Sequence, residues 1–199
     1  MLLAVGAAAS PCLAMGPMAG PAGRTPAQHH VSPESCVACA RAMDWEACHQ
    51  TALGLADERE FTRAIAVEEG VHRNRPYNAE VDAVLARLYQ EGTRQPARAF
   101  ELYHEALSIV PGYPPALLGL GTMMQDSGSL DVAQMYFARG VKERPDEPKF
   151  KVRLAEVLVK AGRDSEARPI LDEVVQRWPG SREAEDAKRM MPVTALARP

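Results

Sequence analysis

Three cysteines and one histidine near the N-terminus have types and spacing that could do chemistry. Cys36, Cys39 and Cys48 lie within thirteen residues, and His49 follows Cys48 directly. Thiolates and imidazole nitrogens bind Zn²⁺, and paired thiols form either a structural disulfide or a redox-active dithiol. The cluster leaves three interpretations open: a disulfide or buried inert thiols, a zinc site, and a redox dithiol.

The spacing of these residues bears on each interpretation. A zinc site would use the three cysteines with His49 or His29, but the adjacent Cys48 and His49 are awkward for tetrahedral ligation. A disulfide is favoured if the chain is exported, because oxidising compartments maintain such bonds. Covalent haem in its simple form is excluded, since Ala40 rather than a histidine follows the Cys-x-x-Cys pair. We expect no cofactor, with zinc at this cluster as the alternative.

The segment before the cluster differs in composition from the rest of the chain. Residues 1–23 contain no charged side chain, and the first positive residue is Arg24. An apolar stretch that passes into small residues resembles a secretory signal peptide, although the basic start is missing. Pro11, Pro17 and Pro21 interrupt any helix of the ~20 apolar residues that crossing a bilayer requires. We expect a periplasmic or otherwise exported protein with no membrane span and at most weak envelope association; a cytoplasmic protein with a disordered extension is the alternative.

A repeat of 34 residues organises most of the remaining chain. Prolines recur at this interval, at Pro111, Pro145 and Pro179. Alanines keep the same phase at Ala99, Ala133 and Ala167, and large residues do so at Tyr103, Phe137 and Leu171. A period of about 34 with a small-large pattern and a terminal proline predicts pairs of antiparallel helices stacked into a solenoid. The expected fold class is all-α.

Glycine and proline predict where these helices end. Gly92, Gly128 and Gly162 are expected to end the first helix of each pair, because glycine readily takes the left-handed conformation of a helix C-terminus. The prolines end the second helices, since a ring without an N–H cannot continue the ladder. Gly92 lies 36 residues before Gly128, so the internal turn of the first unit is expected to hold an extra residue.

With these residues in phase, the chain resembles the tetratricopeptide repeat family. The resemblance is close over residues 114–147 and 148–181, looser over 79–113, and extends to a degenerate N-terminal unit containing Phe61, Ala64 and Ile65. It implies a helical-hairpin solenoid with a C-terminal capping helix and a flexible N-terminal extension. The expected parts are a signal-like or disordered segment (1–31), a cysteine-containing helical segment with the degenerate repeat (32–78), three repeat units (79–181), and a capping helix with a tail (182–199).

Composition and motifs exclude several classes of function. A net charge of −3 gives no general reason to bind nucleic acid. The sequence contains no Gly-x-Ser-x-Gly, no phosphate-binding Gly-x-x-x-x-Gly-Lys and no His-Glu-x-x-His, so we expect no enzymatic activity.

The resemblance implies a protein that binds a segment of another protein in a groove lined by the first helix of each unit. The expected lining is Arg87, Gln90, Glu91, Leu118, Thr122, Gln125, Val152, Glu156, Val159 and Lys160. The subfamily that clamps acidic C-terminal tails carries a lysine and an asparagine one turn apart, and this chain lacks that pair. We expect an adaptor that assists or joins a cell-envelope assembly; the alternative is a metal- or thiol-bearing accessory subunit of a redox complex.

Overall fold

The computed structural model describes residues 32–33 and 44–191. The chain divides into two compact units, with the boundary between Pro76 and Tyr77. In the described part of the first unit, α2 (Trp45–Asp57) and α3 (Phe61–Asn74) pack as a hairpin. The side chain of Asp44 caps α2 by accepting a hydrogen bond from the Glu46 amide.

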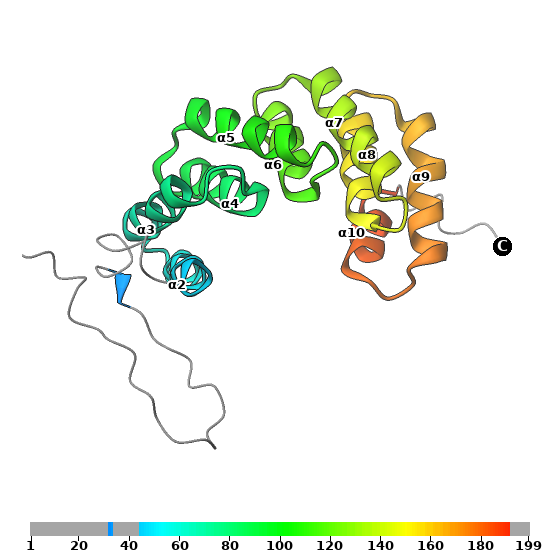
Figure 1. Ribbon diagram of the computed structural model, residues 1–199. Helices are drawn as coiled ribbons and strands as arrows, with labels where there is room; N and C mark the ends of the chain where they lie inside the picture. The colour runs from blue at the N-terminus through cyan, green and yellow to red at the C-terminus, as the bar shows by residue number, and fades with distance from the viewer. Residues whose placement is uncertain (1–31, 34–43, 192–199) are drawn as a thin grey trace, which may run out of the picture. The chain divides into compact units, whose positions relative to one another are not determined.

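The described part of the second unit, residues 77–191, contains three helical hairpins and one further helix (Figure 1). The hairpins pair α4 (Ala79–Leu88) with α5 (Pro96–Ile109), α6 (Pro114–Asp126) with α7 (Leu130–Glu143), and α8 (Pro148–Lys160) with α9 (Asp164–Arg177). Helix α10 (Arg182–Met190) packs on both α8 and α9. The described residues contain helices and turns without strands, and the fold is the expected all-α solenoid.

Most of the expected helix ends are confirmed. Pro111, Pro145 and Pro179 each follow the C-cap residue of a second helix. Gly128 and Gly162 follow the C-caps of α6 and α8 with φ angles of +80° and +71°, a region that favours glycine.

The prediction for Gly92 is wrong. After α4 the chain continues as a π-helical turn, η2 (Tyr89–Thr93), and Gly92 lies inside it. Arg94 takes the left-handed conformation, with a φ of +51°, and lies 34 residues before Gly128. A π turn holds one more residue than an α turn, so η2 absorbs the extra residue and restores the phase of the repeat.

Missing side chains let neighbouring helices approach closely. A Cβ atom at Gly121 would lie 2.4 Å from Phe137 Cε1, and one at Gly140 would lie 2.1 Å from Phe150 Cδ1. Each glycine on one helix therefore makes room for a buried ring on the next. Helix α10 continues this packing with two fully buried alanines, Ala184 and Ala187.

In the described part of the chain, no helix combines the length and the apolar character needed to cross a membrane.

Candidate partner-binding groove

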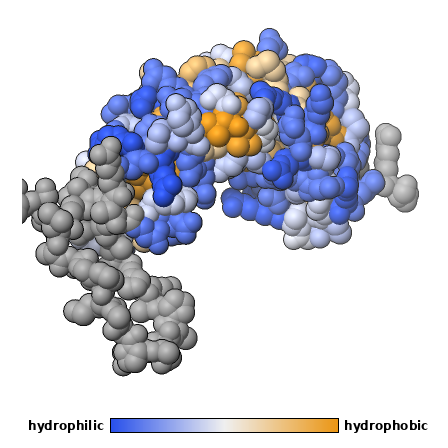
Figure 2. All heavy atoms as spheres, viewed as in Figure 1, coloured by the Kyte–Doolittle hydropathy of each residue, from blue (hydrophilic) through white to orange (hydrophobic). Residues whose placement is uncertain are grey.

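Two hollows lie along the first helices of the second unit. The N-terminal hollow has a volume of about 580 Å³ and is lined by residues of α4, η2, α5, α6 and α8. Its apolar wall includes Val84, Tyr113 and Leu118, and charged groups at its rim include Arg87 and Glu91. Figure 2 shows the corresponding apolar patch over α6, next to hydrophilic surface over α8 and α10. An apolar floor with a charged rim suits a segment that inserts an apolar side chain.

Tyr103 forms part of the floor because Gly119 leaves space for its ring. A Cβ atom at Gly119 would lie 2.2 Å from Tyr103 Cζ, so any larger residue would displace the ring. The Tyr103 hydroxyl donates to Gln90 Oε1 at 3.2 Å. Burial first, and then the carboxylate of Glu91, raise the pKa of Tyr103 far above its ordinary value, so the hydroxyl remains a donor at neutral pH.

The π-helical turn places polar groups at this hollow. Gln90 and Glu91 belong to η2 and both line the hollow. The extra residue of the first unit thus lies at the groove. In other proteins, π turns within helices are also frequently found at functional sites.

The C-terminal hollow has a volume of about 530 Å³ and lies between α8 and α10. Lys149 and Arg153 line both hollows, so the two hollows adjoin along α8 and together make up the candidate groove. Charged residues dominate the lining of the second hollow, which consists of Lys149, Val152, Arg153, Glu156, Arg182, Glu183, Asp186, Arg189 and Met190.

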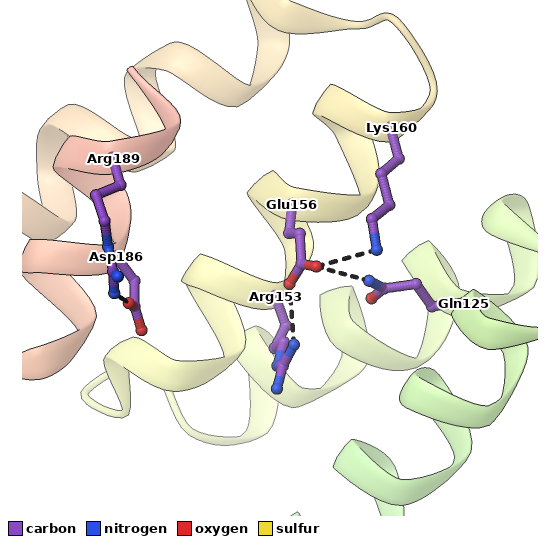
Figure 3. Close-up of polar contacts among 6 residues, drawn as sticks. All are labelled: Gln125, Arg153, Glu156, Lys160, Asp186 and Arg189. Carbon is purple, nitrogen blue, oxygen red and sulfur yellow. Dashed lines mark hydrogen bonds and ion pairs between the residues drawn. The ribbon is translucent and has the colours of Figure 1, made fainter. Parts of the chain in front are cut away.

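Glu156 holds the centre of a polar network in this groove (Figure 3). Its Oε1 accepts from Gln125 Nε2 at 2.8 Å and lies 3.1 Å from Lys160 Nζ, and its Oε2 accepts from Arg153 Nη1 at 2.9 Å. Burial alone would raise the pKa of Glu156, but the hydrogen bonds from Lys160, Gln125 and Arg153 outweigh it, and the pKa lies below its ordinary value. The carboxylate is therefore ionised at neutral pH, and its acceptor capacity is used within the chain.

The predicted lining residues do not all lie in the same hollow of the structure. Arg87, Gln90, Glu91, Leu118 and Thr122 line the N-terminal hollow. The C-terminal hollow includes Val152 and Glu156.

The remaining predicted residues line neither hollow. Gln125 is 8% exposed and, like Lys160, reaches the groove only through its contact with Glu156. Val159 lines a separate depression of about 140 Å³ with residues of α9 and α10, including Met190.

Sequence reasoning missed the contribution of α10. Its polar composition favoured a solubilising cap, yet Glu183, Asp186 and Met190 lie 34 residues after Lys149, Val152 and Glu156. The helix therefore continues the register of groove-lining positions, and this spacing is the signal in the sequence that predicts its role.

The structure describes only part of the cysteine cluster. Cys36 and Cys39 lie outside the described residues. Cys48 is fully buried in α2 and is disulfide-bonded, with its partner outside the described residues. The choice among disulfide partners stays a prediction.

His49 lies beside a buried carboxylate in the same unit. Its Nδ1 is 2.7 Å from Oε1 of Glu68 on α3, and the two side chains are 3% and 0% exposed. This pair links α2 to α3 and engages Nδ1, one of the two ring nitrogens of His49.

Comparison with known proteins identifies the repeats. The tetratricopeptide repeat family matches residues 124–190, which run from the end of α6 to the end of α10. The chain carries tetratricopeptide repeats. The matched region includes α10, in agreement with its register. A search among curated proteins finds no match for the sequence.

Solved tetratricopeptide repeat structures share the fold. MamA from Desulfovibrio magneticus RS-1 (residues 41 to the end) superposes with a TM-score of 0.62 at 20% identity, over 75% of this chain and 86% of that one. Pseudomonas aeruginosa PilF gives a TM-score of 0.61 at 12% identity, over 79% and 71%. YrrB, described as having an unusual peptide-binding site, gives 0.59 at 18% identity, over 73% and 74%. At these identities the likeness shows the fold alone.

Proposed function

We propose that this protein is a non-enzymatic adaptor that holds an extended segment of another protein in the groove formed by the two hollows. The observation that carries this proposal is that the two hollows share Lys149 and Arg153 as lining residues, which supports one binding track across α4, α6, α8 and α10. The fold is that of YrrB, a protein with a peptide-binding site, and helical solenoids commonly bind partners on such extended surfaces.

The chemistry of the groove suits peptide recognition better than catalysis. Tyr103 and Leu118 offer apolar contact area, and Gln90 and Thr122 offer hydrogen-bonding groups beside it. The ionised Glu156 is fixed by three donors, so it has a structural role in the groove rather than the role of a general base.

We also propose that the adaptor works in the cell envelope, where it assists or joins an assembly. The uncharged residues 1–23 support this compartment, because their composition resembles a signal peptide. A disulfide at Cys48 is also favoured in an oxidising compartment. Fractionation of the native host, with the intact mass of the recovered chain, tests this part: full-length protein in the cytoplasmic fraction would contradict it.

Selection of random twelve-residue peptides displayed on phage, against the immobilised full chain, tests the groove. Selected peptides are then synthesised and their dissociation constants measured by fluorescence anisotropy. Leu118→Arg places a charge in the apolar part of the N-terminal hollow and is expected to weaken binding at least about tenfold.

The matched control is Met135→Arg. Met135 is 57% exposed on α7, a second helix, and lines none of the groove. This variant is expected to bind the peptides as the wild type does. Equal binding by both variants, with circular dichroism showing both folded, would place the binding surface elsewhere.

A further inference from the structure

We infer that the partner's segment is acidic where it crosses the C-terminal hollow and carries a bulky apolar side chain about six residues away, in the N-terminal hollow. This inference rests on the proposed function and adds the chemistry of the partner. It comes from the different linings of the two hollows: the N-terminal hollow is electrically balanced and includes Val84, Tyr113 and Leu118, whereas the C-terminal hollow has an excess of positive charge.

The charges differ between the hollows. The N-terminal hollow is lined by three cations (Arg87, Lys149 and Arg153) and three carboxylates (Glu80, Glu91 and Glu147). The C-terminal hollow is lined by four cations (Lys149, Arg153, Arg182 and Arg189) and three carboxylates (Glu156, Glu183 and Asp186). Lys160 adds a further positive charge beside Glu156. The excess of charge at the C-terminal hollow is therefore positive.

The carboxylates of the C-terminal hollow are largely committed within the chain. Glu156 is neutralised by Arg153 and Lys160, and Asp186 pairs with Arg189 in α10 (Figure 3). Among the described residues, Lys149 and Arg182 make no ion pair, and both are exposed. Within the described part of the chain, two cations from different helices thus face one hollow that offers them a single carboxylate, Glu183, without an ion pair of its own, and an acidic segment would supply the remaining counter-charge.

The spacing follows from the helices that form each hollow. The N-terminal hollow centres on α4 and α6, and the C-terminal hollow on α8 and α10. Two interhelix spacings of about 9 Å each separate the centres of the two hollows. An extended chain covers this combined distance in about six residues.

The segments of this chain outside the described residues do not supply such an occupant. Residues 1–31 and 192–199 contain no acidic side chain, and residues 34–43 contain only Glu34. The acidic segment therefore belongs to another molecule.

Peptide selection with a charge-reversed variant tests the inference. The probes are the phage-selected peptides, and the variant is Lys149→Glu with Arg182→Glu, two exposed residues outside the core. Peptides selected on the wild type are expected to carry Asp or Glu about six residues from Trp, Phe, Tyr or Leu. The variant should bind them at least about tenfold more weakly. Selection repeated on the variant should replace the acidic residues with Lys or Arg and retain the apolar one.

The matched control carries the same change of charge on second helices. Lys142 on α7 and Arg168 on α9 are exposed and line neither hollow of the groove, so Lys142→Glu with Arg168→Glu should bind the original peptides within about twofold of the wild type. If both double variants lost the same amount of peptide affinity, the loss would reflect net charge alone, and the inference would be overturned.

The outcomes separate the inference from the proposed function. Peptides that bind through an apolar residue without acidic preference would overturn the inference and leave the adaptor function standing. No binding peptide of any composition would overturn both. Light scattering tests whether the chain forms a dimer. If it does, and if only the variant at Lys149 and Arg182 is monomeric, a second copy of the chain is the occupant and the inference is overturned.

Discussion

Gly140 on α7 and Phe150 on α8 form a complementary pair in which the missing side chain of one accommodates the ring of the other. The same positions of the repeat hold Ala106 with Ala116 in the preceding unit and Val174 with Ala184 in the next. Where the second helix has its smallest residue, the following helix has its largest. At this interface the glycine therefore offsets the large ring of the following helix, whereas the neighbouring units hold smaller pairs.

Gly140→Ala should overpack this interface. The new Cβ would meet the ring of Phe150 at 2.1 Å, and we expect the free energy of unfolding to fall by about 1–3 kcal/mol, despite the helix propensity of alanine. Urea unfolding followed by circular dichroism measures the change.

Gly54→Ala is the control for this prediction. Gly54 lies in α2, and a Cβ atom there would meet nothing within 4 Å. The substitution should stabilise its unit by about 0.5–1 kcal/mol through helix propensity alone. If Gly140→Ala proved equally stabilising, the close packing against Phe150 would be refuted.

The residue that follows the first helix of a unit takes the left-handed conformation, and opposite substitutions at this position in two units should have opposite effects on stability. Gly128→Ala forces a Cβ into a residue with a φ of +80° and should cost about 1 kcal/mol. Arg94→Gly, at the same position of the preceding unit, relieves a φ of +51° and should stabilise by up to about 1 kcal/mol. Thermal unfolding of both variants checks the pair, and opposite signs from those expected would contradict the assignment of Arg94 to this position.

The pattern of prolines and glycines predicted the helices because it reflects constraints that act within a few residues. A proline lacks the N–H that continues a helix, so Pro111, Pro145 and Pro179 predicted the ends of α5, α7 and α9. The rule is not general, because α9 accommodates Pro169 within it. The prediction failed at Gly92 because the left-handed residue there is an arginine, which carries no local signal for that conformation.

The groove depends on contacts between distant parts of the chain. Arg153, Glu156 and Lys160 are neighbours along α8, and the resemblance predicted Glu156 and Lys160, but not Arg153, as groove residues. Gln125 joins them from α6, 31 residues earlier, and this tertiary contact turns the cluster into part of the groove. The spacing of residues along one helix does not reveal such contacts. The register of Glu183 and Asp186 with α8, in contrast, is present in the sequence and could have been found there.

Stability should depend on pH through Glu156. Its folded pKa lies below its ordinary value of 4.5, so its contribution is present above that value and is lost as the pH falls through the folded pKa. We expect Glu156→Gln to lower the free energy of unfolding by about 0.5–1 kcal/mol at pH 7, and by less at pH 3. Urea unfolding of both proteins at the two pH values measures this. A difference of the same size at both would show that the charge of Glu156 is irrelevant.

The proposed adaptor function requires α4, α6, α8 and α10 to form one binding track. Backbone amide chemical shifts of the isotope-labelled full chain, titrated with a selected peptide, test it most directly. We expect the largest shifts to occur together at Leu118, Thr122, Arg153 and Asp186, with little change at Val132 and Met135 on α7. Shifts concentrated on α5, α7 and α9, with those four residues unmoved, would contradict it.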